Sequence, residues 1–268
     1  MGIRAVANYT GKRSCHRMPG GGFDSAQELI TSFNGPKLWY DPSNITTLQQ
    51  DSAGTIPVVS AGDPIGRIMD ISGANHHATQ TTAGSRPTWQ TTFAVFDGTD
   101  DSWATPAIDF SSTDKLTVVV GMRKLSDAAV GMLMELGSSV ALAGAFNMRA
   151  PRGAFPTCDV TASANGSTFA VDILTTASAP NTAVLTASIN LGAASGAEIV
   201  SWVNGVVQAS STGDAGTGPF GNLPLNIGRR NNLSTPFNGN IYGLIIVGRL
   251  LSTPERVMLE QYMTAKSV

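Results

Sequence analysis

Charged residues are scarce in this chain. Lys, Arg, Asp and Glu make up 13% of its 268 residues, about half of the ~25% that is usual in globular proteins. The formal net charge is only −2, so no strong field draws the protein to nucleic acid or to an anionic membrane. No apolar run reaches the ~18 residues of a membrane-spanning helix, and no apolar segment of the secretory-signal type follows the first basic residues. We therefore expect no nucleic-acid partner and no membrane insertion.

Cysteine and catalytic motifs are also scarce. The two cysteines, Cys15 and Cys158, lie far apart and have no spacing typical of a zinc site, so we expect two free thiols and no metal held by cysteine. The adjacent His76 and His77 would point to opposite faces of an extended segment, which favours hydrogen bonding over a shared metal. The sequence has no G-x-S-x-G elbow, no P-loop and no dinucleotide-binding fingerprint. From these absences we expect that the protein has no cofactor and no catalytic residues.

Glycine and short β-like segments are plentiful. The chain has 29 glycines, and strand signals recur every 8–15 residues or so from residue 36 onward, as in a two-sheet sandwich. The strongest strand is Lys115–Met122, rich in valine. Asn204-Gly205 between apolar pairs predicts a hairpin. Near the end, Ser252 with Glu255 three residues later predicts a capped helix. We expect one all-β domain, a two-sheet antiparallel sandwich over residues 36–268 with a short C-terminal helix.

Residues 1–35 differ from the rest and form an expected N-terminal arm. A glycine-rich breaker at 19–22 follows the basic residues, and residues 24–30 could form a helical turn or two. Such a segment cannot bury enough apolar surface to fold alone. Two interpretations are open: a disordered tail, or an anchor that becomes ordered against a partner. The residues expected to anchor are Arg4, Lys12, Arg13 and Arg17.

Several segments, taken in order, resemble the concanavalin A-like (LamG-like) jelly-roll family. They are Phe96–Asp101, Leu116–Val120, Trp202–Val206, Leu225–Gly228 and Phe237–Ile241, with Leu251, Ser252 and Glu255 after them. The resemblance covers about 230 residues and implies a jelly-roll sandwich with its terminal helix packed on it.

A narrower resemblance lies upstream and is to LamG-like proteins encoded among the structural genes of tailed bacteriophages. It is carried by five segments: residues 38–43, 50–55, 66–73, 75–80 and 85–88. It implies a virion component, such as a fibre, decoration or tail appendage protein, assembled in the host cytoplasm. The partners implied are other virion proteins and further copies of the chain, most often in a trimer.

The jelly-roll family includes glycoside hydrolases, so the acidic residues were tested for a catalytic pair. Retaining glycosidases need two carboxylates about 5–5.5 Å apart. The family's enzymes carry their acidic residues on one strand in the pattern Glu-x-Asp-x-x-Glu. The chain has five glutamates, and neither Glu135 nor Glu198 has an acid two residues later. We therefore expect that the protein is not an enzyme.

Ligand binding remains open, since a cell-surface glycan would need an aromatic side chain beside Asp, Asn or Arg. Each candidate also has a structural interpretation. Trp103 could be a core aromatic, the aspartates at 97, 100 and 101 could serve a turn rather than calcium, and residues 229–232 could be a solvated loop. The functional hypotheses are a virion structural role, with adhesion to the host surface, and a carbohydrate-binding module. The candidate ligand-binding residues are Asp100, Asp101, Trp103, Arg229, Arg230, Asn231 and Asn232.

Overall fold

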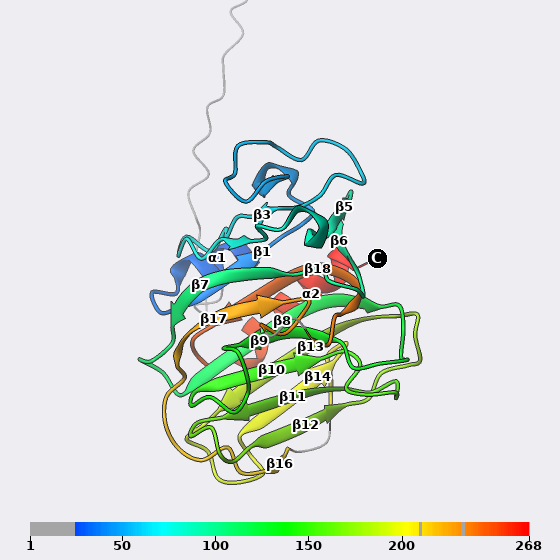
Figure 1. The fold of residues 1–268 in the computed structure, drawn as a ribbon. Coiled ribbons are helices and arrows are strands. Elements are labelled where there is room, and N and C mark those ends of the chain that lie inside the picture. Colours follow the sequence, from blue (N-terminus) through cyan, green and yellow to red (C-terminus); the bar gives the residue numbers. More distant parts are fainter. Residues whose placement is uncertain (1–24, 209–210, 232–233, 268) are drawn as a thin grey trace, which may run out of the picture.

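The computed structural model describes residues 25–208, 211–231 and 234–267, which form two antiparallel sheets packed face to face (Figure 1). This architecture confirms the predicted all-β sandwich. The eight-stranded sheet has the order β15-β14-β13-β8-β18-β6-β5, with β1 also paired to β18. Its strands are β1 (Lys37–Tyr40), β5 (Thr88–Gln90), β6 (Phe93–Asp97), β8 (Lys115–Lys124), β13 (Asn181–Asn190), β14 (Ile199–Val203), β15 (Val206–Val207) and β18 (Asn238–Val247).

The second sheet has ten strands in the order β16-β12-β11-β10-β9-β17-β7-β4-β3-β2. Two short 3-10 turns, Ile45–Thr47 and Ala83–Ser85, lie in its connections. The ten strands are β2 (Leu48–Gln49), β3 (Arg67–Ile68), β4 (Ala78–Thr79), β7 (Trp103–Asp109), β9 (Met132–Leu136), β10 (Ala145–Arg149), β11 (Cys158–Ser163), β12 (Ala170–Leu174), β16 (Thr212–Gly213) and β17 (Asn222–Ile227).

The main core lies between the sheets and is filled by alternate residues of each strand. In β8, Val118 and Val120 face this core, whereas Val119 belongs to a second apolar cluster on the other side of the sheet. A strand buried on both faces needs an almost unbroken apolar sequence. This explains the valine run that made β8 the strongest strand in the sequence.

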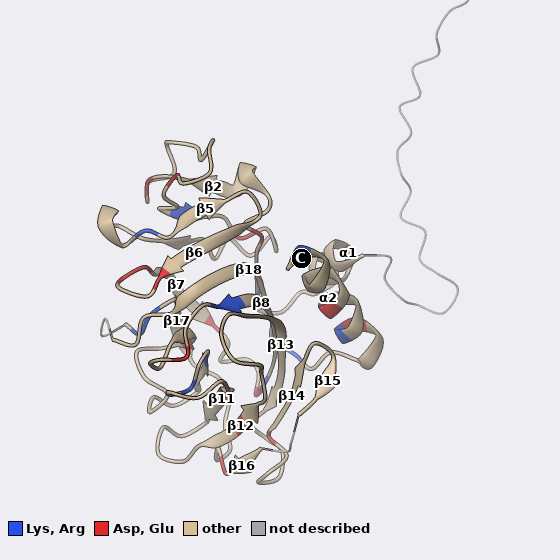
Figure 2. Cartoon of the chain, turned by 90° about the vertical axis from the view of Figure 1, so that its right-hand side faces the viewer, with Lys and Arg blue, Asp and Glu red and all other residues tan. Residues whose placement is uncertain are grey.

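Two helices cover the outer face of the eight-stranded sheet, on the side away from the ten-stranded sheet (Figure 2). The helix α2 (Thr253–Lys266) has the predicted capping box between Ser252 and Glu255. Its Leu259 and Met263 pack with Val119 of β8 and residues of α1 in one apolar cluster. Neither helix in the described part of the chain is long and apolar enough to cross a membrane.

The helix α1 (Ala26–Ser32) corrects the expected limit of the N-terminal arm. The side chain of Ser25 caps it, accepting a hydrogen bond from the Glu28 backbone amide. Ile30 is fully buried against the sandwich, and the ammonium group of Lys37 donates to the Ile30 carbonyl at 2.9 Å. The folded unit therefore includes residues 25–35. Four residues expected to anchor lie outside the described residues: Arg4, Lys12, Arg13 and Arg17.

One predicted hairpin is present in the structure, and one of the longer strands was not predicted. The Asn204-Gly205 hairpin is confirmed, with both residues at positive φ between β14 and β15. The strand β11 was missed. Its sequence, Cys-Asp-Val-Thr-Ala-Ser, alternates polar and apolar residues, but the side chains are small and only one is β-branched and apolar. It pairs with the strands directly before and after it, β10 and β12, so the missed signal is the weak strand preference of its small side chains.

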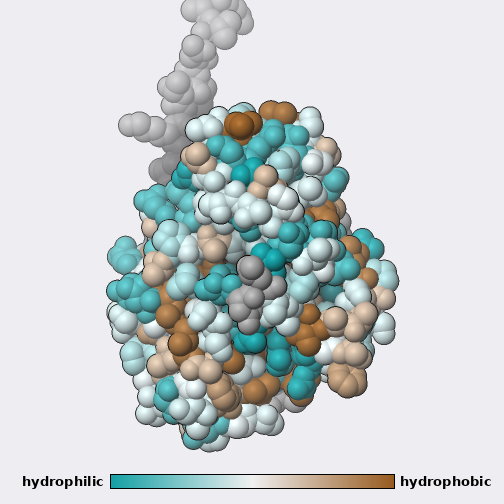
Figure 3. All heavy atoms as spheres, viewed as in Figure 1, coloured by the Kyte–Doolittle hydropathy of each residue, from teal (hydrophilic) through white to brown (hydrophobic). Residues whose placement is uncertain are grey.

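The outer face of the ten-stranded sheet is polar where the helix-covered face is apolar. One transverse row crosses β7, β17, β9, β10 and β11, with each residue paired in register to the next. Figure 3 views this side of the molecule, on which polar and apolar side chains are interspersed. The row consists of Ala104, Asn226, Glu135, Asn147 and Thr161.

Candidate functional site

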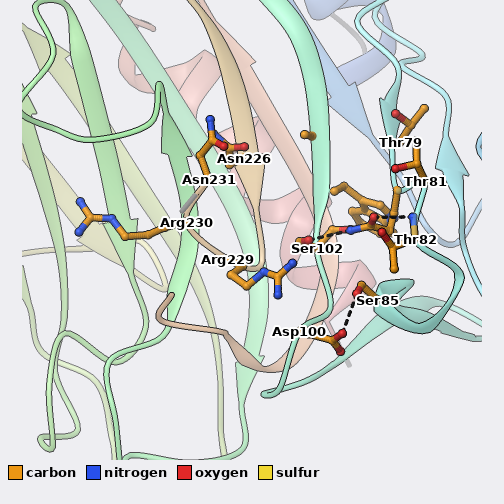
Figure 4. Close-up of a pocket in the computed structure, with 13 residues that line it drawn as sticks. Thr79, Thr81, Thr82, Ser85, Asp100, Ser102, Asn226, Arg229, Arg230 and Asn231 are labelled. Carbon is orange, nitrogen blue, oxygen red and sulfur yellow. Dashed lines mark hydrogen bonds between the residues drawn. The ribbon is translucent and has the colours of Figure 1, made fainter. Parts of the chain in front are cut away.

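A polar pocket of about 460 Å³ opens on this face of the ten-stranded sheet. Three connections form its walls: the segment after β4, the turn between β6 and β7, and the loop after β17. Figure 4 shows the side chains that line it. The pocket is lined by Thr79, Gln80, Thr81, Thr82, Ser85, Asp100, Ser102, Trp103, Ala104, Asn226, Arg229, Arg230 and Asn231.

The aspartates of the β6–β7 turn hold that turn together. Asp97 accepts hydrogen bonds from the backbone amides of Thr99 and Asp100. Asp101 accepts from the Asp97 amide at 3.0 Å. Carboxylates that bind nearby backbone groups are typical of tight turns. Oxygens of the three carboxylates also lie within 4.8 Å of one another, but each of these hydrogen bonds serves the turn, and calcium binding stays an untested expectation.

Asp100 and Asp101 differ in what they face. Asp100 lines the pocket and accepts a 2.6 Å hydrogen bond from the Ser85 hydroxyl, so its carboxylate is positioned from a second wall. Asp101 is buried behind it, and burial raises its pKa to about 6 despite the hydrogen bond from the Asp97 amide. Only Asp100 of the two therefore offers a carboxylate to the pocket.

The neighbouring arginines point in opposite directions (Figure 4). Arg229 extends toward Ser102 and Asp100 in the pocket and is only 8% exposed. Its Nε has no hydrogen-bond partner among the described residues. Arg230 turns away and forms a bidentate ion pair with the fully buried Glu135, at distances of 2.8–3.2 Å. This hydrogen bonding raises the pKa of Arg230.

Trp103 belongs to the core rather than to an exposed platform. The residue is 2% exposed, and its indole N–H donates to the Ile65 carbonyl at 2.9 Å. Its ring meets Phe96 edge to face, with 5.1 Å between the ring centroids. One side of Trp103 reaches the floor of the pocket, but a sugar cannot stack on a buried ring.

The pocket brings together candidates from both predicted groups. Asp100 comes from one segment, and Arg229, Arg230 and Asn231 come from the other, whereas Asn232 lies outside the described residues. Asn226 was not among the predicted site residues. It is the outward residue between the inward Leu225 and Ile227 of β17. An asparagine alternating with buried apolar residues was the available signal.

This set of side chains can bind but offers no acid–base pair. Asp100 is an acceptor, Arg229 is a donor, and the amide of Asn231 provides both functions. The amide of Asn226 already donates to the Gly137 carbonyl at 2.7 Å. Glu135 is held by Arg230, and Glu198 accepts hydrogen bonds from the backbone amides of Gly196 and Ala215. The pocket thus presents hydrogen-bond donors and acceptors side by side, an arrangement that suits a polar ligand with several hydroxyl groups.

The two histidines hydrogen-bond within their loop. The Nδ1 atom of His77 accepts from the Asp70 amide at 2.9 Å. The backbone amide of His76 donates to the Asp70 carboxylate, also at 2.9 Å. Among the described residues, the group of acidic, histidine and cysteine side chains close enough to share a metal is the aspartate turn.

Sequence comparisons give no relative. No protein-family model matches the chain, and no curated protein matches it in sequence.

Structural comparison finds the same sandwich in toxin binding domains. One match is the ligand-binding domain of botulinum neurotoxin serotype D in complex with N-acetylneuraminic acid, with a TM-score of 0.55 and 11% identity over 89% of this chain and 53% of the other. Another is the receptor-binding domain of botulinum neurotoxin D, with a TM-score of 0.54 and 12% identity over 76% and 52% of the two chains. The chain thus spans about half of these proteins. At such low identity the likeness establishes the fold alone.

Proposed function

We propose that this protein is a receptor-recognition module that binds a carbohydrate in the pocket between the β6–β7 turn and the loop after β17. The observation that carries this proposal is the position of Arg229. A buried guanidinium group with an unpartnered N–H is costly to maintain. A ligand that brings oxygen atoms to it would recover part of that cost.

Sugar hydroxyls fit the remaining polar groups of the pocket. A hydroxyl can donate one hydrogen bond and accept others. It can therefore donate to Asp100 while accepting from Arg229 or from an asparagine amide. Hydrogen bonds to charged groups contribute about 1.5–3 kcal/mol each, and Ser85 holds the Asp100 carboxylate in place before a ligand arrives. The structurally similar ligand-binding domain of botulinum neurotoxin serotype D was crystallised in complex with N-acetylneuraminic acid, which supports a sugar as the ligand.

A glycan array tests this function. The full chain, the Arg229→Gln variant and an Arg123→Gln control on β8 are compared at equal concentration. We expect the wild type and the control to retain the same glycans, and Arg229→Gln to bind them about 10–100-fold more weakly. Thermal unfolding of each variant shows whether it is folded. Failure of the wild type to retain any glycan, or undiminished binding by a folded Arg229→Gln variant, would overturn the proposal.

The setting we propose is the surface of a tailed-phage particle, with the chain in a homo-oligomer and its N-terminal residues attached to another virion protein. The phage-type segments and the basic N-terminal residues support this role. Because α1 is part of the folded unit, the informative deletion removes residues 1–24. We expect the shortened protein to stay folded and to be missing from particles. Its normal incorporation would contradict attachment through these residues.

A further inference from the structure

A second cavity, of about 400 Å³, lies on the same face of the ten-stranded sheet. Arg230 lines both cavities and stands between them, with its guanidinium group held by Glu135. The lining is more apolar than that of the first pocket. It consists of Val130, Met132, Val140, Asn147, Arg149, Thr161, Phe169, Val171, Arg230 and Thr235.

One polar group in this cavity is unsatisfied. Asn147 is 3% exposed, and its Oδ1 has no hydrogen-bond partner among the described residues. A buried amide oxygen without a partner costs about 1–3 kcal/mol. The other long polar side chain here, Arg149, is already engaged by the buried Asp159 through its Nε at 2.8 Å. Asn147 is therefore the group that a ligand would satisfy.

The two cavities are close enough for one ligand. Asn226 lines the first and Asn147 the second, and they lie in register on either side of Glu135, on β17, β9 and β10. Neighbouring strands are about 4.8 Å apart, so these two backbone positions are roughly 10 Å apart. An oligosaccharide of a few residues spans that distance, whereas a single sugar does not.

We propose that the ligand is an oligosaccharide containing an N-acetylated amino sugar, with its acetamido group in this second cavity. The inference rests on the carbohydrate-binding function proposed above. The acetamido N–H donates to the Asn147 amide oxygen, and its methyl group contacts the apolar side chains of Met132 and Val171. Arg230 contacts the linkage between the sugar in this cavity and the sugar held by Arg229.

The test uses an array of glycans graded from one to eight sugars, in matched pairs that carry either an acetamido group or a free amine at the same position. It compares the wild type with Asn147→Leu, which keeps the volume but removes the amide. A second variant, Val171→Trp, fills the cavity from a half-buried position and leaves the core untouched. Arg229→Gln reports on the first pocket.

We expect the wild type to prefer the acetylated partner and chains of more than one sugar. Asn147→Leu should weaken binding to the acetylated glycans about tenfold. Val171→Trp, which fills the space of the acetyl methyl group, should act in the same direction. If folded Asn147→Leu and Val171→Trp variants bind as the wild type does while Arg229→Gln fails, the second cavity is not a subsite and the proposed function stands. If the wild type retains no glycan, both proposals fall.

Discussion

The outer faces of the two sheets differ in polarity: a row of residues across one sheet is mostly apolar, and the corresponding row across the other is mostly polar. On the eight-stranded sheet, the row in register is Trp39, Ile245, Val119, Thr186 and Trp202, and two helices cover most of it. On the ten-stranded sheet, the corresponding row is Ala104, Asn226, Glu135, Asn147 and Thr161. Loops rather than helices cover that row, and two cavities remain above it.

The difference separates a face that contributes stability from a face on which we propose recognition. An apolar row gains free energy only when it is removed from water, so the helices must close tightly over it. A polar row can remain near solvent if its charges are paired, and a group left unpaired beside an open cavity is available to a ligand. The ion pairs of Arg230 with Glu135 and of Arg149 with Asp159 leave Arg229 and Asn147 as the described residues of this face that have an unpartnered polar atom at a cavity.

The largest expected effect tests the paired charges of the polar face. Arg230→Ala leaves the fully buried Glu135 without its cation, which should lower the free energy of unfolding by about 3–5 kcal/mol. Urea denaturation measures this loss. Adding Glu135→Gln to the same variant removes the stranded charge and should restore much of the stability. A loss below about 1 kcal/mol in the single variant would show that the pair contributes little.

Removing a side chain from the helix-covered face should have a slightly smaller effect. Leu259→Ala deletes a fully buried side chain of α2 that packs on the eight-stranded sheet. Large-to-small changes of this kind cost about 2–5 kcal/mol. Chemical denaturation gives the loss, and glycan binding of the folded fraction should be unchanged. Impaired binding by the folded fraction would mean that the two faces are coupled.

Two valines provide a matched comparison of the faces. Val184 on β13 is buried under the helices, and Val171 on β12 is half-buried at the second cavity. Burial of a valine side chain stabilises by about 1.5–3 kcal/mol, so we expect Val184→Ala to fall in this range and Val171→Ala to lose less than about half as much. Equal losses in urea denaturation would show that both faces are sealed alike.

The smallest effect concerns Asp101 and depends on pH. Its folded-state pKa is raised to about 6, chiefly by burial. The neutral carboxyl thus stabilises the fold below the unfolded pKa of about 3.9, and that contribution is lost as the pH rises through about 6. We expect Asp101→Asn to match the wild type at pH 4 and to be more stable at pH 8, on the order of 1 kcal/mol. A lower stability of the variant at pH 8, measured by thermal unfolding, would contradict this assignment.

Local sequence signals predicted the parts of the fold that local physics determines. The capping box at Ser252 and the hairpin at Asn204 involve residues next to one another, so they could be predicted directly. The strand β11 could not, because its side chains are small and give a weak strand signal. The packing of α1 could not, because residues far along the chain bury it.

The sequence predicted which segments contribute to the candidate site. It did not predict which way their side chains point or which partners they bind. Arg229 and Arg230 look equivalent in the sequence. Their roles differ because Glu135, 95 residues from Arg230, binds one and not the other. Asn147 gave one usable signal, as a polar residue between the apolar Phe146 and Met148 of β10. Its unpartnered amide depends on its neighbours on β9 and β11, which the sequence does not bring together.

The packing of α1 beside α2 also determines how the protein can be displayed. Tyr262 and Lys266, near the end of α2, both donate to the Asp41 carboxylate at 2.8 Å, which fastens the end of the folded unit to its beginning. The described chain thus enters and leaves on the helix side of the sandwich (Figure 2). A larger body joined directly after α2 would stand behind the eight-stranded sheet. The polar face would then point outward, toward whatever surface the body approaches.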